Sequence, residues 1–374
     1  MLAGASRTLI RVWLQTVLST NGRVDVAVLV WFVDQRTMDL EPIEPQTAVE
    51  LYLADRETEL RYASLRSHKS RLGHFVRWCD KRDIDNCNNL TGRLCHEFRI
   101  WRRNDGELNP VSEKTQMDTF RVFIRWLGTI DGVDPDLHHK VRSPDITPDQ
   151  NSRSVMLESE DAEQMLAYLE KYEYATRRHV VLALLWHTML RLGGLRALDL
   201  DDYNREEQFL AIVHRPDTGT PIKNGKSGQR LVSLSGEMCI VLNDYIRIRR
   251  QNVEDEYGRQ PLVTTSRGRP GRSTISAYCY EFTRPCAVGQ DCPHGKDIDD
   301  CEAASTKDDA SKCPSSVSAH PIRRGGITHY LANDVPETTM SQRANVNPDV
   351  IEQHYDQRTA KEKMEQRRQY LEKI

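Results

Sequence analysis

No apolar run in the 374-residue chain is long enough to cross a membrane. A membrane-spanning helix needs about 20 consecutive apolar residues, and the longest run here, Val24 to Val33, is interrupted by Asp25. The run also lacks the small-residue cleavage site of a secretory signal. We therefore expect a cytoplasmic protein that is neither membrane-bound nor secreted.

Cysteine is also scarce, and neither sign of charge dominates. Nine cysteines are too few for a disulfide scaffold in a chain of this length, so we expect them to be thiols or metal ligands. The chain has 52 Lys and Arg against 55 Asp and Glu, a net charge of -3. This balance neither requires nor excludes nucleic acid, because DNA affinity depends on where the cations cluster.

The length of the chain favours two domains, each with its own apolar core. Helical periodicity begins near Gln46, and a stretch with two prolines separates it from a second patterned region. We expect a multidomain, mainly α protein in which a helical domain precedes an α+β domain with a small antiparallel sheet. The predicted parts are an extension that is disordered or follows a misassigned start (1–40), the helical domain (41–144), a linker (145–154) and the α+β domain (155–374).

A run of cations without any acid lies in the helical domain, between Arg61 and Trp78. Its members are Arg61, Arg66, Lys69, Arg71 and Arg77. The run predicts either a DNA-binding helix that lies along phosphates or an ordinary solvated helix face, and taken alone it favours neither.

The second domain combines a buried helix with short strands. The stretch from His179 to Leu190 is almost wholly apolar, which predicts a helix buried on most sides. Residues 209–213 and 230–234 read as strands, and a loop rich in Gly and Lys separates them.

Chemically suggestive residues follow this helix in a fixed order. Arg191 comes directly after it, His320 and Arg323 form a His-x-x-Arg box, and Tyr355 lies 32 positions (355 minus 323) after that box. With this order the chain resembles the tyrosine recombinases, the phage integrase family, and most of all their archaeal branch. The resemblance covers about residues 45 to 374, and its helical part is similar to the family's SAM-like core-binding domain.

The resemblance assigns a role to each matching position. It implies the catalytic residues Arg191, Lys226 (with Lys223 as the alternative hairpin lysine), His320, Arg323, Asn345 and the nucleophile Tyr355. Asn345 stands where the family usually has His or Trp, and its amide can still donate a hydrogen bond to a phosphate oxygen. The acid often found three positions after the first arginine is replaced by Gly194, and Asp199 is the nearest carboxylate.

These residue types suit attack on a phosphodiester. Arg191 and Arg323 can stabilise the charge that develops on the phosphate oxygens, and nearby cations favour the phenolate of a tyrosine. A lysine can protonate the leaving 5′ oxygen. The resemblance implies a 3′-phosphotyrosyl intermediate, duplex DNA as partner, a homotetramer on two DNA sites, and no small-molecule substrate, ATP or cofactor for catalysis.

An insertion at about residues 284–314 gathers further metal-ligand types. They are Cys286, Cys292, His294, Cys301 and Cys313. Four thiolate or imidazole ligands would hold a structural zinc ion, which would stabilise an insert without a core of its own. The spacing is looser than paired C-x-x-C motifs, and reduced thiols in a loop are the alternative.

Two other functions fit parts of the pattern. A type IB topoisomerase uses the same nucleophile, and a non-catalytic DNA-binding protein would retain the fold, an alternative to which the missing third-box His lends weight. Integration, excision, inversion and dimer resolution share one chemistry, so these residues do not distinguish them. We expect the two domains to close around duplex DNA through phosphate contacts.

Overall fold

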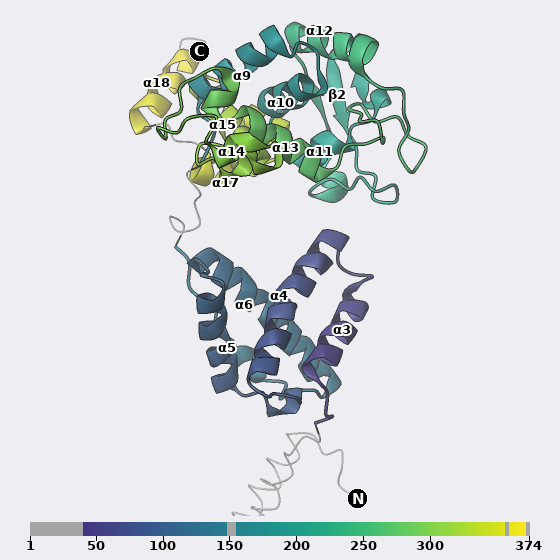
Figure 1. The fold of residues 1–374 in the computed structure, drawn as a ribbon, viewed down its shortest axis with the longest axis vertical. Helices are drawn as coiled ribbons and strands as arrows, with labels where there is room; N and C mark the ends of the chain where they lie inside the picture. The colour runs from purple at the N-terminus through teal and green to yellow at the C-terminus, as the bar shows by residue number, and fades with distance from the viewer. Residues whose placement is uncertain (1–39, 148–154, 356–358, 372–374) are drawn as a thin grey trace, which may run out of the picture. The chain divides into compact units, whose positions relative to one another are not determined.

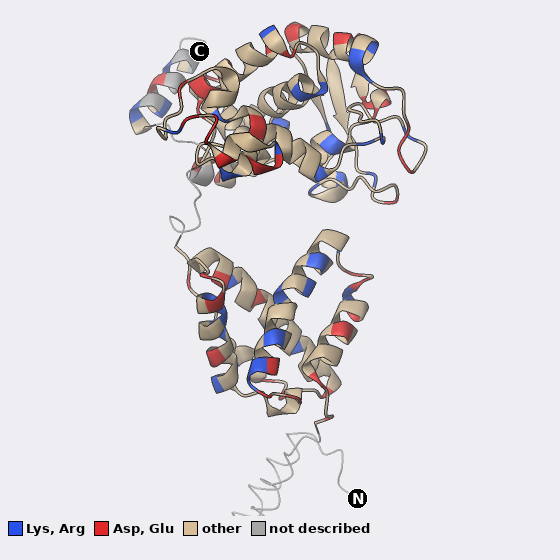
Figure 2. Ribbon diagram, viewed as in Figure 1, with Lys and Arg blue, Asp and Glu red and all other residues tan. Residues whose placement is uncertain are grey.

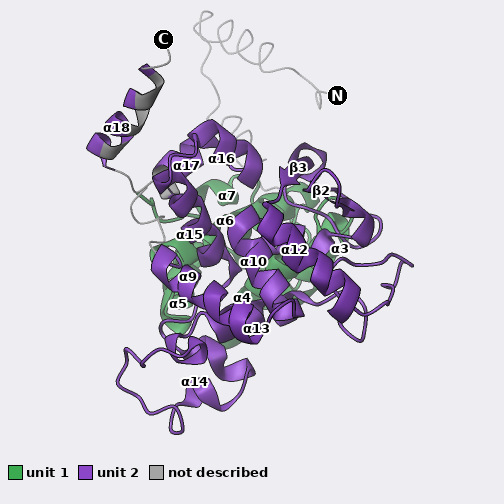
Figure 3. Ribbon diagram, turned by 90° about the horizontal axis from the view of Figure 1, so that it is seen from above, with its two compact units in different colours: residues 1–151 green, residues 152–374 purple. Residues whose placement is uncertain are grey.

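The computed structural model describes residues 40–147, 155–355 and 359–371. The chain divides into two compact units, Met1–Asn151 and Ser152–Ile374 (Figures 1 and 3). All but the last residue of the predicted extension 1–40 lies outside the described residues. The predicted mainly α fold with a small antiparallel sheet is confirmed.

The described part of the first unit is entirely helical. Its helices are α3 (Pro45–Arg56), α4 (Tyr62–Lys81), α5 (Gly92–Asp105), α6 (Pro110–Leu127) and α7 (Leu137–Lys140), with 3-10 turns η1 (Cys87–Asn89) and η2 (Gly128–Ile130). The core is rich in aromatic rings: Phe98 and Phe120 pack with centroids 4.8 Å apart, and Phe75 lies 5.0 Å from Phe120. Such offset and edge contacts stabilise a small core beyond the area they bury.

Polar caps start several of these helices. The side chain of Asn109 accepts a hydrogen bond from the backbone N–H of Ser112 at 2.9 Å, and Pro110 fills the first helical position of α6. Thr91 caps α5 in the same way. A cap satisfies one of the orphan N–H groups at a helix start, so the sequence itself fixes where these helices begin.

The second unit surrounds the buried helix α10 (Arg177–Thr188). Its other helices are α9 (Ser159–Tyr172), α11 (Leu192–Ala197), α12 (Gly236–Asp244), α13 (Arg272–Phe282), α14 (Glu302–Ser305), α15 (Ala319–Ala332), α16 (Glu337–Ala344), α17 (Pro348–His354) and α18 (Ala360–Leu371). Shorter turns are η3 (Leu200–Asp202), η4 (Gly225–Gly228), the π-type η5 (Tyr245–Arg249), η6 (Pro285–Val288) and η7 (Asp308–Lys312). The prediction of a buried helix is confirmed, and α10 ends two residues early because Met189 is left-handed, at φ 50°.

A three-stranded antiparallel sheet lies beside α12 (Figure 1). It consists of β1 (Tyr203–Asn204), β2 (Phe209–Ile212) and β3 (Arg230–Ser233). β2 and β3 pair from Phe209 opposite Ser233 to Ile212 opposite Arg230. Both predicted strands are therefore confirmed, each one residue shorter than expected, and residues 213–229 form their long connection.

Two glycines let α15 approach α10 closely. A Cβ on Gly325 would lie 1.9 Å from the backbone oxygen of Leu157, and one on Gly326 would lie 2.8 Å from that of Trp186. Neither backbone oxygen can move cheaply, so only glycine fits here. The close approach places Arg323, two residues before Gly325, against the end of α10.

Within the described ranges, no helix is both long and apolar enough to cross a membrane.

Candidate active site

The first and second arginines of the sequence motif meet at one turn. Arg191 lies between α10 and α11, and its Nη1 donates to the backbone oxygen of Asn345 at 3.0 Å. Arg323, on α15 and only 1% exposed, donates through Nη2 to the backbone oxygen of Ala344 at 2.7 Å. It also donates to the backbone oxygen of Met189. Both guanidinium groups therefore hold the end of α16, where Asn345 is left-handed at φ 51°.

Tyr355 lies beside these arginines. It ends α17 and is 5% exposed, and its backbone oxygen accepts a hydrogen bond from Thr328 Oγ1 at 2.8 Å. Its side chain lies close enough to Arg191 and Arg323 to act on the pKa of both guanidinium groups. The guanidinium of Arg324 lies 5.7 Å from the centre of its ring. The structure thus brings together the tyrosine and both motif arginines.

The lysine-bearing turn of the sheet connection reaches the same place. Asn224 Nδ2 donates to Asn345 Oδ1 at 3.4 Å, and a Cβ on Gly228 would lie 3.0 Å from Asn345 Nδ2. Lys226 lies between these two contact points in η4, and Lys223 directly precedes them; both lysines are exposed. The turn that carries both candidate lysines is therefore placed against Asn345.

His320 lies in the first turn of α15 and is exposed. Residues three apart on a helix share a face, so His320 and Arg323 project to the same side of α15.

Two further arginines of this site were not predicted. Arg230, at the start of β3, donates to the backbone oxygens of Arg343 at 2.7 Å and Gly228 at 3.0 Å. Arg343 donates to the backbone oxygen of His187 at 3.0 Å and to Ser233 Oγ at 3.1 Å. Burial, together with the charges of Arg191 and Arg343, lowers the pKa of Arg230 to about 10.

The arginine cluster of Arg191, Arg230, Arg323 and Arg343 has no acidic counterpart among the described residues. Every hydrogen bond given above for its members goes to a neutral oxygen, and none of the four takes part in an ion pair within the described ranges. The Nε atoms of Arg323 and Arg343 are buried and lack hydrogen-bond partners there. Burial and the charge of Arg191 together lower the pKa of Arg323 to about 10. The side chain of Tyr355 acts in the opposite direction and raises this pKa. Buried, unneutralised cations favour an anionic ligand.

The basic run of the first unit is only partly exposed. Arg61, Arg66 and Lys69 are exposed on α4, where cations recur along the helix (Figure 2). Arg71 is half-buried and donates to Thr119 Oγ1 at 3.1 Å, while Arg77 is paired with Asp105 of α5. Four of the five predicted DNA-binding residues are therefore exposed, Arg77 while it is paired with Asp105, and Arg71 is half-buried.

The cysteines of the insertion are half-buried thiols. Within the described residues, no three His, Cys, Asp or Glu side chains are grouped so as to hold a metal ion. Burial raises the pKa of the Cys286 thiol, and the charge of Arg284 opposes this effect. His294 contacts Ser315 Oγ at 2.9 Å rather than a cysteine. The zinc site gains no support from these positions and stays a prediction.

The remaining cysteines are all buried, namely Cys79, Cys87, Cys95, Cys239 and Cys279. Desolvation raises the pKa of Cys87 and Cys95 to about 12, so neither is a reactive thiolate.

Comparison with models of protein families and with curated protein sequences found no match. Among solved structures, the N-terminal domain of a phage integrase/site-specific recombinase (tnp) from Haloarcula marismortui is 36% identical, over 28% of this chain and 99% of that chain, with a TM-score of 0.27. The Tn1549 transposon integrase in complex with a circular intermediate DNA is 12% identical over 86% of this chain and 99% of that chain, with a TM-score of 0.60. A lambda integrase dimer bound to a COC' core site is 12% identical over 96% of this chain and 86% of that chain, with a TM-score of 0.53.

The two distant likenesses show that this chain has the fold of the DNA integrases. With 36% identity across nearly all of the Haloarcula domain, the chain belongs to the phage integrase family of site-specific recombinases, the enzymes known as tyrosine recombinases.

Proposed function

We propose that the protein is a site-specific recombinase that cleaves and rejoins duplex DNA through a 3′-phosphotyrosyl bond to Tyr355. The observation that carries the proposal is the arginine cluster, two of whose half-buried or buried members lie beside Tyr355, and none of which pairs with a carboxylate among the described residues. A phosphodiester is the anionic substrate that such a site fits best.

The arginine cluster supports the chemistry of phosphoryl transfer. Arg191 and Arg323 present planar donors that do not deprotonate near neutral pH, and both already lie beside the tyrosine. Charge that grows on the non-bridging oxygens in the transition state would be stabilised by these donors, without reorganisation of the site. Asn345 supplies an amide in place of an imidazole.

The reaction breaks one bond for each bond it forms. Tyr355 Oη attacks phosphorus while its proton passes to His320 or water, and the bond from phosphorus to the 5′ oxygen breaks. Lys226, or Lys223 in its place, gives a proton to the leaving 5′ oxygen. The phosphotyrosyl ester keeps the energy of the broken bond, so rejoining requires no ATP or other cofactor.

The partner would be duplex DNA, held through its phosphates by both units. The Tn1549 integrase is bound to a circular intermediate DNA and the lambda integrase is a dimer on a core site. For this chain we extend that to a homotetramer on two DNA sites, with Arg61, Arg66 and Lys69 as exposed phosphate contacts and α18 reaching a neighbour. The proposal includes a cytoplasmic location, where the protein would meet its DNA substrate.

A covalent trapping assay tests the proposal. Nicked duplexes from DNA flanking the gene are incubated with protein, and denatured samples are examined for protein that carries DNA. We expect a species that forms with wild type and vanishes in Tyr355→Phe, while DNA binding is unchanged. If binding is present and no covalent species forms, the non-catalytic DNA-binding alternative is favoured, with Asn345 as the first residue to restore to His.

A plasmid relaxation assay distinguishes recombination from topoisomerase activity. A recombinase needs two partner sites, whereas a type IB topoisomerase relaxes a supercoiled plasmid that carries no partner site. Relaxation of such a plasmid at the rate of covalent trapping would favour the topoisomerase.

Structural zinc in the insertion is a separate proposal, held by four of Cys286, Cys292, His294, Cys301 and Cys313. Metal analysis of the purified protein tests it. Stoichiometric zinc that is lost in Cys292→Ser would support the site, and metal-free protein of full stability would dismiss it.

A further inference from the structure

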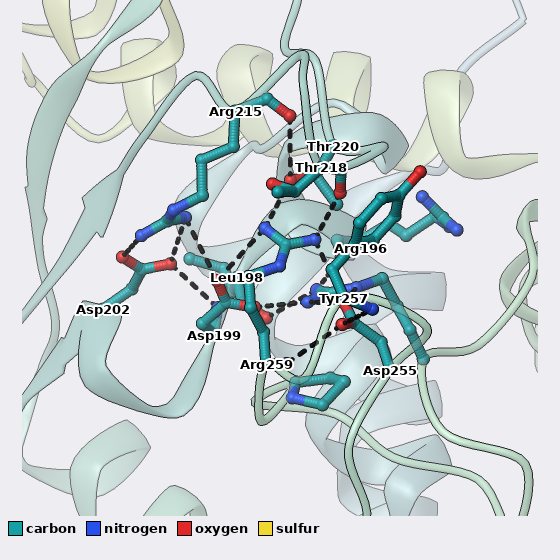
Figure 4. A network of polar contacts seen from close by, with 12 residues as sticks. Arg196, Leu198, Asp199, Asp202, Arg215, Thr218, Thr220, Asp255, Tyr257 and Arg259 are labelled. Carbon is teal, nitrogen blue, oxygen red and sulfur yellow. Dashed lines mark hydrogen bonds and ion pairs between the residues drawn. The ribbon is translucent and has the colours of Figure 1, made fainter.

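A second group of arginines in the same unit is neutralised by acids. Asp199, directly after α11, is paired with Arg269 and lies 3.4 Å from both Arg259 and Arg215. Asp255 lies 2.8 Å from Arg269 and 3.0 Å from Arg259. Figure 4 shows these acidic side chains meeting the guanidinium groups in one continuous set of contacts. We call this set, together with Asp202, the ion-pair network.

The ion-pair network holds the first half of the connection between β2 and β3. Arg215 donates to both carboxylate oxygens of Asp202, at 2.6 and 2.9 Å. Arg259 donates to the backbone oxygen of Thr218 at 2.6 Å and to Thr220 Oγ1 at 2.9 Å (Figure 4). Residues 215–220 are therefore fastened to the body of the unit by charge-assisted hydrogen bonds.

This fastening extends to the lysines. The backbone N–H of Ile222 donates to His214 Nδ1 at 3.1 Å, and the side chain of Ile222 is buried in the core. Lys223 follows directly, and Lys226 lies three residues further along the turn. The position of both candidate proton donors thus depends on a segment that the ion-pair network fixes.

The same network also holds the helix that follows Arg191. Arg269 Nη1 donates to the backbone oxygens of Arg196 at 2.7 Å and Leu198 at 3.1 Å, at the end of α11. Arg196 in turn donates to the backbone oxygens of Pro270 at 3.1 Å and Gly219 at 3.3 Å. One buried set of ion pairs therefore connects the helix next to the phosphate-binding arginine with the turn that carries the lysines.

We infer that Asp199 is a positioning residue, which sets the place of the proton-donating lysine relative to Arg191. The inference rests on the proposed function. Asp199 is buried and its carboxylate is engaged by arginines, so it acts through the hairpin connection and not on DNA. Proton transfer demands hydrogen-bond reach between lysine and leaving oxygen, and a displacement of about 1 Å can cost about 10²-fold in rate.

The leaving group offers a direct test. An alkoxide must receive the lysine's proton as it departs, whereas a 5′ sulfur in the bridging position departs as a thiolate without one. A defect in proton donation is therefore repaired by a 5′-bridging phosphorothiolate, and a defect in phosphate binding or in the nucleophile is not.

The experiment uses the full-length protein and a nicked duplex whose scissile phosphate has been located by covalent trapping. Cleavage rates are measured on the ordinary duplex and on the same duplex with a 5′-bridging sulfur. For Asp199→Asn we expect a loss of about 10²-fold on the ordinary duplex and near-wild-type rates with sulfur. Lys226→Ala and Lys223→Ala show which lysine gives this pattern directly.

A second variant covers the case in which Asp199→Asn does not fold. Arg259→Gln removes the contacts to Thr218 and Thr220 and should give the same sulfur-repaired defect. Arg247→Gln is the matched control, because Arg247 is 74% exposed and paired with Asp244 outside the network; it should cleave both duplexes at the wild-type rate.

Three outcomes are distinguished by these rates. Repair by sulfur in the network variants supports the positioning role. Folded network variants that are equally slow, or equally fast, on both duplexes overturn it while the proposed function stands. A wild-type protein that cleaves neither duplex overturns the proposed function itself.

Discussion

The second unit contains two groups of arginines, which differ in the chemical groups that face them. In the arginine cluster, guanidinium groups donate to backbone oxygens and a serine hydroxyl, and no described acid pairs with them. In the ion-pair network, arginines donate to Asp199, Asp202 and Asp255. Both groups are at least half-buried. We infer from the difference that the neutralised arginines hold loops together, and we propose that the unneutralised arginines bind an anion.

The largest effect should come from breaking the ion-pair network. Arg269→Met removes the shortest ion pairs of Asp199 and Asp255 and leaves these acids only the longer contacts to Arg259 and Arg215, so we expect the free energy of unfolding to fall by about 3–5 kcal/mol. Urea denaturation measures the loss. Arg247→Met, in the exposed pair, should change it by less than about 1 kcal/mol. Equal stability of the two variants would mean that the network is not structural.

Removing an arginine from the arginine cluster should have the opposite result, in which activity falls and stability is nearly unchanged. Arg191→Gln takes away a donor to the transition state, so we expect covalent trapping to slow by about 10²–10³-fold. The free energy of unfolding should change by less than about 1 kcal/mol, because no acid in the described part of the chain pairs with the charge removed. A variant that loses stability and activity together would erase the distinction between the groups.

An anion should stabilise the protein through the arginine cluster alone. Inorganic phosphate at about 100 times its dissociation constant should add about 2.7 kcal/mol to the free energy of unfolding. Thermal unfolding with and without phosphate measures this in the wild type. Arg191→Gln should lose most of the shift and Arg247→Met should keep it; an equal shift in both variants would point to nonspecific salt effects.

The smallest expected effect is the loss of stability at acidic pH. Burial alone would raise the pKa of Asp255, but hydrogen bonds from Arg269 and from the backbone of Arg259 and Tyr257 outweigh it and hold the pKa below 3.8. The stability that Asp255 contributes is therefore present above pH 3.8 and is lost as pH falls below that value.

Unfolding measured across this range compares Asp255→Asn with the wild type. Their difference should be largest at neutral pH and shrink in acid, whereas the difference for Arg191→Gln should stay constant, because no described carboxylate faces Arg191. A constant difference for Asp255→Asn would mean that its pKa is the same in the folded and unfolded chain.

The features predicted correctly from sequence are those with local causes. The apolar stretch of α10 and the short strand segments β2 and β3 depend on residues close in sequence. The site residues came from an ordered set of motifs, whose chemistry is still to be tested. Residues whose function depends on distant backbone were missed: Arg230 reaches an oxygen 113 positions away, and Arg343 one 156 positions away. No local pattern encodes such a partner.

The basic run on α4 is a second case in which the sequence does not reveal the partners of a residue. Within the run there is no acid, yet Arg77 finds Asp105 on the next helix, 28 positions on. Arg71 turns inward to Thr119 across the core. A sequence window shows the charge of a helix but not the neighbours that packing brings to it. The basic run as a DNA-binding set stays a prediction.

The left-handed backbone at Asn345 bears on how this chain departs from its family. Few residues other than glycine adopt such a φ at low cost, and asparagine and histidine are both enriched there. Asparagine and histidine can therefore replace each other at this position without disturbing the turn to which Arg191 and Arg323 donate hydrogen bonds. The backbone thus restricts the side chain at this position to a short set, whose members differ in the hydrogen-bond donor that, on our proposal, would face the phosphate.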